Sequence, residues 1–375
     1  MTLSVPSRML ARAIDAAIHA THRKATRFFR AELDRLPRVI LPVSYSDKMF
    51  WRRVFDHNPA FVAHCDKLEA KRLFKEQDVE VAEVLWSGTD PARLPAALRH
   101  ADVVVKMNAG CDRNWFFRHQ GKDEAAFHAT CQGWLEQTFG VDGLEWAYGM
   151  APKRLFAERS IAPHPRDIDE IKVHLFSGEV FYALIYRGEK TSDGRSGIFD
   201  VAGRRLQVTN SIVAKDPGRA LSPDYRVPDC YRRAIEVARR LAAGTDYIRV
   251  DFMVVDGRLF GGEITPYPSA GLMTNSDPAV LAQMGRCWDL RQSWFLRTPQ
   301  TGWRVAYQTM LRRHVERLGT DPIPVLTGLN PCLVRDDSDT ALDRRADFRL
   351  KDADVASAAV GASRLPAMGR KKQCE

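Results

Sequence analysis

Residues 249–265 read Arg249-Val-Asp-Phe-Met-Val-Val-Asp-Gly-Arg-Leu-Phe-Gly-Gly-Glu-Ile-Thr265, and they are the most informative stretch of the chain. Two alternating apolar runs flank Asp256-Gly257, a pair that is typical of the turn of a β-hairpin. The strands carry Asp251 and Glu263 where a half-buried strand normally places apolar residues. Because an unpaired buried carboxylate is costly, these acids need a partner. A hard cation such as Mg²⁺, held jointly with phosphate oxygens, is the natural candidate.

The register of this hairpin determines whether the two acids face the same side. A strict two-residue turn pairs Val255 with Arg258. Glu263 then falls opposite Val250 and faces away from Asp251, because side chains alternate between the two faces of a sheet. With that register alone, the two carboxylates do not share a cation.

A longer loop or a bulge removes this difficulty. A three-residue loop, or a bulge at Gly261-Gly262, places Asp251, Glu263 and Thr265 on one face. Glycine is the residue expected at such a bulge. The alternative interpretation is an ordinary exposed hairpin whose two acids are solvated.

Size and charge set broad limits on function. The chain has 375 residues, which is enough for two or three lobes with substantial cores. Its formal net charge of +9 is compatible with an anionic partner such as a nucleotide, an acidic polymer or a membrane surface. The basic residues are mixed with 47 acidic ones, and no nucleic-acid-binding motif is present. We therefore expect no nucleic acid partner.

The cysteines indicate free thiols. An odd, dispersed set without CxxC spacing argues against a disulfide framework, against a structural zinc site, and for a reducing cytosol. Cys111 lies in a candidate functional loop. Because no base is identifiable beside it, we do not expect it to act as a nucleophile. The seven positions are Cys65, Cys111, Cys131, Cys230, Cys287, Cys332 and Cys374.

The sequence predicts no membrane-spanning segment and no signal peptide. Residues 7–35 instead predict an amphipathic helix. Docking on the protein's own body is the favoured interpretation, and peripheral contact with an anionic membrane is the alternative. The apolar stripe consists of Leu10, Ile14, Ile18, Ala25, Phe28 and Phe29, and the surrounding basic residues are Arg23, Lys24, Arg27 and Arg30.

Helices interleaved with paired strands indicate an α+β or α/β architecture. Beyond residue 333, few large apolar residues remain, so this tail is predicted to be disordered. The predicted strands cover residues 79–85, 102–106, 154–159, 171–176 and 180–186, and the predicted helices cover residues 123–139, 231–243 and 278–316.

Three further positions are candidates for binding a nucleotide. Lys106 ends a strand before a loop with Asn108 and Gly110, where a lysine and backbone N–H groups can reach phosphate oxygens. The loop is not a Walker A sequence, and Lys106 can equally be an ordinary surface residue. Glu158 can contact adenine and ribose, or form a salt bridge with a neighbouring arginine. Lys172 can point into a binding site or lie on an exposed face.

The order of these groups resembles the ATP-grasp superfamily. The resemblance is closest to the branch associated with teichuronopeptide biosynthesis, and it covers about residues 36–300. It departs from many relatives at Thr265, where they have asparagine. The motifs that carry it are Tyr45-Ser-Asp-Lys-Met-Phe-Trp51 with Asp56 and Pro59, Asp66-Lys67, Lys106 and its loop, Glu145-Trp-Ala-Tyr148, Glu158, Lys172, Arg249-Val-Asp251 and Gly262-Glu-Ile-Thr265.

The resemblance implies two α+β lobes that clamp ATP, with an N-terminal helical extension. The implied domains are residues 1–60 (helical extension and lead-in), 61–150 (lobe with the phosphate loop), 151–300 (lobe with the metal hairpin), 301–332 (C-terminal helix and connection) and 333–375 (tail). The implied cofactor-binding residues are Lys67, Lys106, Asn108, Gly110, Glu158 and Lys172. The implied Mg²⁺ ligands are Asp251, Glu263 and Thr265, and the implied catalytic residues are Arg249 and Lys106.

The implied reaction is ATP-dependent carboxylate–amine ligation through an acylphosphate. We expect a small-molecule or glycan carboxylate and an amino-acid amine as substrates, in cell-surface polysaccharide modification. We expect a cytoplasmic protein, with peripheral membrane contact through the N-terminal helix as an open alternative. A kinase-like phosphotransferase and a non-catalytic nucleotide- or glycan-binding subunit are the rival functions.

Overall fold

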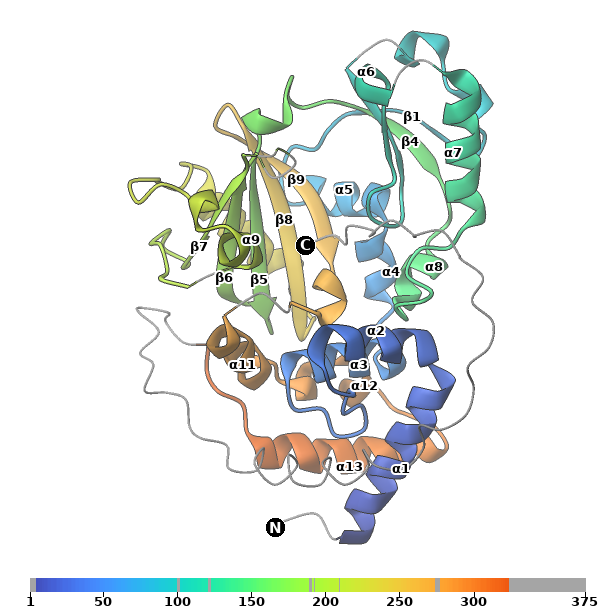
Figure 1. Ribbon diagram of the computed structural model, residues 1–375, viewed down its shortest axis with the longest axis vertical. Coiled ribbons are helices and arrows are strands. Elements are labelled where there is room, and N and C mark those ends of the chain that lie inside the picture. The colour runs from blue at the N-terminus through green and yellow to red at the C-terminus, as the bar shows by residue number, and fades with distance from the viewer. Residues whose placement is uncertain are drawn as a thin grey trace, which may run out of the picture.

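Two antiparallel sheets and a group of helices make up the computed structural model of the protein (Figure 1). The structure describes residues 5–99, 102–120, 123–188, 191, 193–208, 210–273 and 277–323. The predicted disordered tail beyond residue 333 lies outside the described residues.

The larger sheet has five strands in the order β7-β6-β5-β8-β9. Helix α10 (Tyr231–Leu241) covers one of its faces and buries Ile235 and Val237 against it. The opposite face is therefore free to carry polar groups. The strands are β5 (Asp169–Phe176), β6 (Glu179–Arg187), β7 (Arg195–Phe199), β8 (Tyr247–Val255) and β9 (Arg258–Thr265).

The smaller sheet has four strands in the order β1-β4-β2-β3. Helix α7 (Glu124–Glu136) packs on it through Phe127 and Cys131, which contact a separate apolar core that includes Trp115. The strands are β1 (Val84–Gly88), β2 (Val103–Met107), β3 (Asn114–Phe116) and β4 (Leu155–Arg159).

Helix α5 (Lys67–Lys75) joins the two sheets. Its Asp66 N-cap side chain accepts a hydrogen bond from the backbone N–H of Leu68 at 2.8 Å. The helix packs against β9, where the ring of Phe74 approaches Gly261 so closely that an added Cβ would lie 2.2 Å from it. Glycine is therefore required at this position of β9. The short helix α4 (Ala60–Cys65) lies beside both α5 and the short helix α8 (Trp146–Met150).

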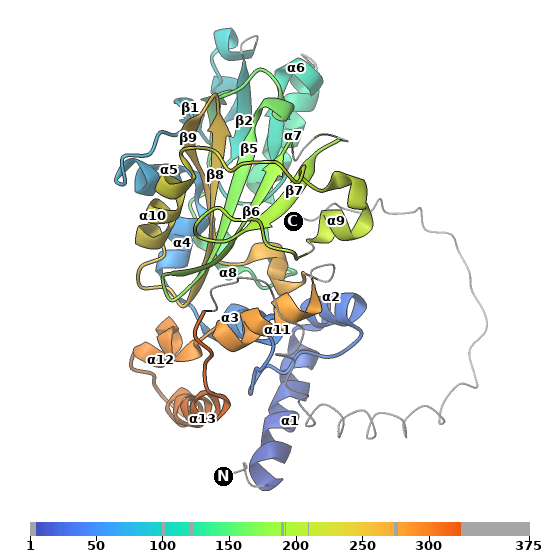
Figure 2. The same cartoon turned by 90° about the vertical axis from the view of Figure 1, so that its left-hand side faces the viewer.

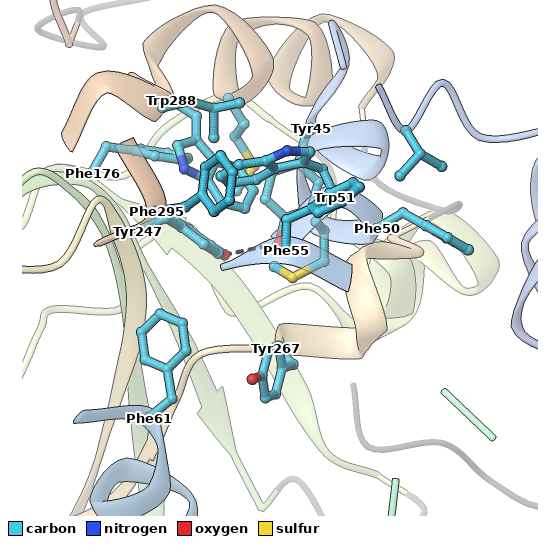
Figure 3. Close-up of a cluster of buried hydrophobic side chains, with 14 of the residues drawn as sticks. Tyr45, Phe50, Trp51, Phe55, Phe61, Phe176, Tyr247, Tyr267, Trp288 and Phe295 are labelled. Carbon is cyan, nitrogen blue, oxygen red and sulfur yellow. Dashed lines mark hydrogen bonds between the residues drawn. The ribbon is translucent and has the colours of Figure 1, made fainter. Parts of the chain in front are cut away.

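The remaining large helices form a helical cap at the end of the larger sheet (Figures 1 and 2). Its core is aromatic: Trp51, Phe55 and Phe295 pack together, and the Tyr45 and Tyr247 hydroxyls lie 2.9 Å apart (Figure 3). The cap helices are α1 (Val5–Thr21), α2 (Arg23–Leu33), α3 (Tyr45–Phe55), α11 (Pro278–Cys287), α12 (Trp294–Arg297) and α13 (Trp303–Leu318).

A fully buried arginine joins the helical cap to the hairpin. Arg52 Nη1 donates to the backbone oxygens of Tyr247 and Pro266, at 2.9 and 2.8 Å, and both oxygens lie at the open end of the β8–β9 hairpin. Its Nη2 lies 2.5 Å from Asp246 Oδ1, and Trp288 donates to the second oxygen of Asp246 at 2.7 Å. The segment around Tyr45–Trp51 thus fixes the position of the hairpin.

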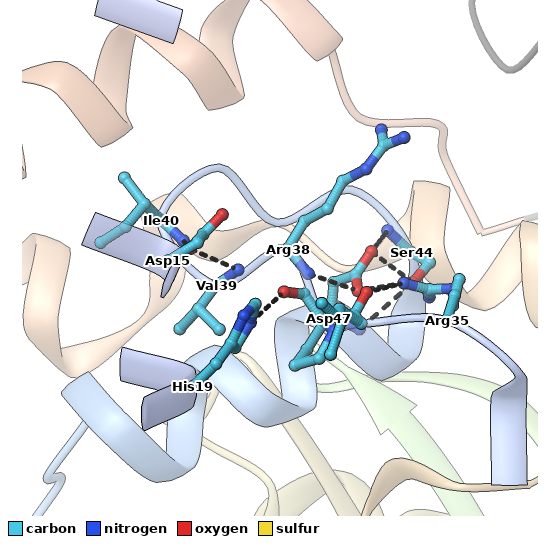
Figure 4. A network of polar contacts seen from close by, with 10 residues as sticks. Asp15, His19, Arg35, Arg38, Val39, Ile40, Ser44 and Asp47 are labelled. Carbon is cyan, nitrogen blue, oxygen red and sulfur yellow. Dashed lines mark hydrogen bonds and ion pairs between the residues drawn. The ribbon is translucent and has the colours of Figure 1, made fainter. Parts of the chain in front are cut away.

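Polar contacts attach α1 and the start of α3 to the segment between them (Figure 4). Asp15 accepts hydrogen bonds from the backbone N–H groups of Val39 and Ile40, at 3.1 and 2.8 Å. Asp47 forms a capping box with Ser44 at the start of α3 and an ion pair with Arg35 at 2.7 Å. These contacts satisfy backbone donors that would otherwise be buried without partners.

Several predicted elements differ from the observed ones. The single helix predicted over residues 7–35 is wrong, because it breaks at His22 into α1 and α2. The predicted helix over residues 278–316 is three helices, and the strand predicted at 79–85 is displaced to β1. The shorter elements are α6 (Phe117–Gln120), α9 (Ser211–Lys215), and 3₁₀ helices at Pro91–Arg93, Ala96–Arg99, Pro165–Asp167, Pro217–Arg219, Pro268–Gly271 and Leu290–Gln292.

The apolar stripe of the N-terminal helices packs on the protein's own body. Ala25 and Phe29 are buried in the cap core, and Ile14 and Ile18 are partly buried against it, whereas Leu10 is exposed. Docking therefore accounts for most of the stripe, and membrane contact stays a prediction. Within the described residues, none of the helices combines the length and apolarity that crossing a membrane requires. None of the five cysteines that the structure describes forms a disulfide, as predicted.

Candidate functional site

The β8–β9 hairpin has both the two-residue turn and the bulge. Asp256 and Gly257 take positive φ values of 49° and 75°, which suit a type I′ turn. Val255 pairs with Arg258, and the register shifts beyond the pair formed by Phe252 and Gly261.

The shift leaves Gly262 and Glu263 opposite the single residue Asp251, because Val250 pairs with Ile264. An added Cβ on Gly262 would lie 2.8 Å from the Asp251 backbone oxygen, so this position of the bulge requires glycine. Both acids interact electrostatically with Arg249 on the same face. The predicted bulge is confirmed, and the exposed-hairpin alternative is wrong because Asp251 is buried.

Arg249 and Asp251 form a buried bidentate ion pair. The Nε–Oδ1 and Nη2–Oδ2 distances are 2.7 and 2.6 Å. Burial raises the pKa of Asp251 above its ordinary value, although Arg249 and Lys172 act to lower it. The pair orients the guanidinium, while the remaining lone pairs of the carboxylate can still bind a cation.

Glu263 projects from the bulge toward α5. Its Oε1 lies 3.2 Å from Lys67 Nζ, which also donates to the backbone oxygen of Gly110 in the loop of residues 108–114. Although 42 % of the Glu263 side chain is exposed, basic groups surround its carboxylate. Burial acts to raise its pKa, but Lys67 and Arg249 together lower the pKa to about 2. Glu263 is therefore ionised throughout the neutral range.

Glu158 binds two lysines. Lys106 Nζ lies 2.6 Å from its Oε1 and Lys71 Nζ lies 2.8 Å from its Oε2. Burial acts to raise the pKa of Glu158, but the two lysines lower it overall. Glu158 therefore does not form the alternative salt bridge to a neighbouring arginine. The alternative that Lys106 is an ordinary surface residue is also wrong. Arg159 pairs instead with Glu83.

Sequence reasoning missed Lys71 as a site residue. It lies four residues after Lys67 on α5, so the two side chains lie on the same helix face. This spacing was the available signal. Lys71 is buried, and its Nζ donates to the Ala82 backbone oxygen at 3.0 Å as well as pairing with Glu158.

The side chain of Asn108 makes internal hydrogen bonds. Its Nδ2 donates to Asp66 and to the Pro152 backbone oxygen at 2.7 and 2.8 Å, and its Oδ1 accepts from Arg154 N–H at 2.9 Å. The amide of Asn108 therefore fixes the start of the loop of residues 108–114. Gly110 follows with a φ of 112°, and an added Cβ would lie 2.8 Å from the ring of Phe139.

Strand β5 adds two basic side chains to this face of the sheet. Lys172 pairs across the strands with Asp251, and its Nζ lies 3.5 Å from Glu170. His174 pairs with Arg249, and its Nδ1 lies 2.8 Å from the Tyr247 hydroxyl. Burial, followed by the charge of Arg249, lowers the pKa of His174 well below its ordinary value, so this histidine is neutral.

These contacts gather most of the predicted residues into one charged cluster. Thr265 lies beside the cluster as the strand partner of Arg249, whereas the side-chain amide of Asn108 makes other hydrogen bonds. The cluster consists of Lys67, Lys71, Lys106, Glu158, Lys172, Arg249, Asp251 and Glu263. Its basic groups outnumber its carboxylates, which suits a polyanionic ligand.

The donor set fits Mg²⁺ better than a softer metal. Two carboxylates and a hydroxyl offer hard oxygen atoms, and Mg²⁺ commonly combines one or two protein carboxylates with substrate phosphates. The described residues contain no group of three or more His, Cys, Asp or Glu that forms a complete metal cage. Two cavities, of about 230 and 320 Å³, are lined by other residues than those of the cluster.

Comparison with known proteins identifies the family. The family described as TupA-like ATPgrasp matches residues 47–286, more than half of the chain. A search of curated proteins found no match.

Three solved structures illustrate the likeness to ligases. D-alanine–D-alanine ligase from Bacillus anthracis, complexed with ATP, is 15 % identical, with 68 % of this chain and 67 % of that chain covered and a TM-score of 0.33. L-amino acid ligase from Bacillus licheniformis is 12 % identical (56 % and 44 % covered, TM-score 0.36). D-alanine–D-alanine ligase from Helicobacter pylori is 17 % identical (59 % and 61 % covered, TM-score 0.32). The family assignment does not rest on these structures. It rests on the family match over residues 47–286, and the chain belongs to the TupA-like ATP-grasp family.

Proposed function

We propose that this protein is an ATP-dependent ligase that joins a carboxylate to an amine. The observation that supports this most is the convergence of Asp251 and Glu263 through the bulge, next to Arg249 and four lysines. Two acids on one face can hold Mg²⁺ together with phosphate oxygens. The nearby lysines can exchange their carboxylate partners for those oxygens.

In the proposed first step, a carboxylate oxygen of the substrate attacks the γ-phosphorus of ATP, and the bond to the β-phosphate oxygen breaks. Lys67 and Lys106 neutralise the phosphates, and Arg249 faces the phosphoryl group in transit. Magnesium ion at Asp251 and Glu263, with Thr265 beside them, would supply further charge neutralisation. ADP leaves and an acylphosphate forms.

In the second step, the amine attacks the acyl carbon, phosphate leaves and the amine loses a proton. This chemistry depends on positioning more than on a protein nucleophile. The segment after β9, residues 266–271, is our candidate for the acceptor side. There, Ser269 and Ala270 both have positive φ values, 48° and 50°, a strained conformation that often accompanies function. We further propose that the carboxylate belongs to an acidic sugar or glycan.

An oxygen-18 experiment tests the acylphosphate directly. A panel of acidic sugars labelled in the carboxylate is incubated with ATP, Mg²⁺ and amino acids, and the phosphate and product are analysed by mass spectrometry. The proposal predicts that phosphate gains one labelled oxygen and that turnover requires both the carboxylate and the amine. A phosphotransferase would instead phosphorylate a hydroxyl without an amine. Turnover that is unchanged in Asp251→Asn and Glu263→Gln would refute this site.

A further inference from the structure

A cavity of about 320 Å³ lies between the helical cap and residues 138–149, outside the charged cluster. Its walls are largely apolar and include Val54, Phe139, Leu144 and Trp146. The ring of Phe139 also packs against Gly110, so the same side chain touches the cavity and the loop of residues 108–114. The volume lies within the range of pockets that bind small molecules, about 300–1,000 Å³.

A tight turn places one acid in the wall of this cavity. The backbone N–H of Glu145 donates to the Gly140 oxygen at 2.9 Å, and Leu144 between them has a φ of 61°. A positive φ is strained for a residue with a branched apolar side chain. An added Cβ on Gly140 would lie 2.8 Å from Glu145 Cβ and 3.1 Å from its Oε2. The turn therefore depends on glycine to place this carboxylate.

Glu145 is the acidic group of the wall, and the charge of Arg53 acts on it. It precedes α8 without capping it, and no hydrogen bond or ion pair of its carboxylate occurs in the described part of the chain. Arg53 also lines the cavity, but its Nη1 donates to the Gly143 oxygen at 2.6 Å and its guanidinium lies over Phe50.

Two histidines complete the polar part of the wall. Burial lowers the pKa values of His22 and His57 below the ordinary value, so both are neutral at neutral pH. His57 stacks on Trp146 with ring centroids 4.7 Å apart and presents an aromatic surface. The cavity thus combines apolar and aromatic walls with one carboxylate that makes no hydrogen bond or ion pair within the described residues.

We propose that this cavity binds a small apolar molecule that carries a protonated amine. The amine lies beside Glu145, and the apolar part packs against Phe139 and Trp146. An ammonium group in an apolar cavity needs a charged acceptor, and Glu145 provides one without breaking an existing ion pair. No residue of the charged cluster takes part, so the proposal does not rest on the ligase function.

The ionisation of Glu145 gives the site a pH dependence. Burial, opposed by Arg53, raises the pKa of Glu145 to about 7. Amine binding should therefore weaken as the pH falls from about 8 to 6, because the carboxylate loses its charge while the amine keeps its own. The pKa of Arg53 is about 10, and burial raises those of Cys65, Tyr148 and Tyr267 well above their ordinary values. These neighbours do not titrate in that range, whereas protonation of His22 and His57 would act in the same direction as Glu145.

Binding of three probes of equal length tests the proposal on the full chain without nucleotide. Hexylamine, 1-hexanol and hexanoate are titrated and followed by NMR, and hexylamine is expected to bind at least tenfold more tightly than the other two. Glu145→Gln should weaken hexylamine binding at least tenfold and reduce its pH dependence. Glu136→Gln, at an exposed position on α7, is the matched control and should change neither.

A second variant separates ligand binding from a general loss of structure. Gly140→Ala should displace the carboxylate and weaken hexylamine binding, whereas Gly133→Ala, where an added Cβ meets nothing within 4 Å, should not. Tighter binding of hexanoate than of hexylamine would overturn the proposal, because Arg53 would then be the recognising group. Unchanged hexylamine binding by Glu145→Gln would overturn it as well.

Discussion

The protein contains two groups of enclosed charges that differ in how far they are closed to solvent. In the helical cap, Arg52, Asp56 and Asp246 are at most 1 % exposed. In the charged cluster, by contrast, the side chains of Lys106 and Glu263 are 22 % and 42 % exposed. The first group has no access for a ligand, whereas the second can exchange partners with one.

The partners of the two groups differ in the same way. Arg52 binds backbone oxygens where β8 begins and where β9 ends, so its charge holds the open end of the hairpin in place. In the charged cluster, Lys71 and Lys106 share the single carboxylate of Glu158. We interpret the cap as a structural support and the cluster as a binding site, and each prediction below tests this distinction.

The largest expected effect is on stability, at Arg52. The change Arg52→Met leaves Asp246 buried without its cation, and removal of one partner of a buried pair costs about 3–5 kcal/mol. Urea unfolding measures this loss. The control, Arg313→Met, lies on an exposed face of α13 and should change stability by less than about 0.5 kcal/mol. Equal losses in the two variants would refute the structural role of the cap.

The next effect is on activity, at Glu263. Glu263→Gln should reduce ATP turnover by about 100-fold or more, because a bound metal ion supplies several kcal/mol of charge stabilisation. Its free energy of unfolding should fall much less than that of Arg52→Met, since the side chain is partly exposed and solvent screens its ion pairs. Steady-state phosphate release and urea unfolding measure the two quantities. The matched control is Glu236→Gln on α10, which should change neither quantity. If Glu263→Gln lost stability but kept turnover, Glu263 would be a structural residue and not a site residue.

A smaller effect is expected at the bulge. Gly262→Ala brings a Cβ to 2.8 Å from the Asp251 backbone oxygen, which should cost about 1–3 kcal/mol and separate the two acids. Because the two acids separate, the affinity of Gly262→Ala for Mg²⁺-nucleotide should also fall. Gly133→Ala, in the middle of α7, should instead raise stability by up to about 1 kcal/mol. Unchanged nucleotide affinity in Gly262→Ala would show that the bulge does not organise the site.

The smallest effect is a pH dependence in the cap. Burial and the nearby Asp246 raise the pKa of Asp56 to about 7 in the folded state. A raised carboxyl pKa stabilises the fold fully below the unfolded value of about 4 and loses this contribution as the pH rises toward 7. Buried His64 has its pKa lowered to about 4 and acts in the opposite direction. The difference in unfolding free energy between wild type and Asp56→Asn, measured from pH 4 to 8, isolates Asp56 and should fall with rising pH.

The sequence predicted the hairpin better than it predicted the surroundings. Alternation of side chains and the chemistry of Asp256-Gly257 are local, so the turn and the need for a bulge followed from the residues alone. Lys71 was not predicted as a site residue because its role depends on an ion pair with Glu158, which lies far away in the sequence. The internal bonds of Asn108 and the aromatic cap around Trp51 likewise depend on long-range packing, which no local pattern encodes.

Calorimetric titration with a non-hydrolysable ATP analogue, with and without Mg²⁺, tests the central claim most directly. We predict Mg²⁺-dependent binding to the wild type, and loss of that dependence in Glu263→Gln while its circular dichroism stays that of the folded wild type. Arg313→Met, far from the site, should bind as the wild type does. Equal Mg²⁺-dependent binding by the wild type and Glu263→Gln would contradict the account.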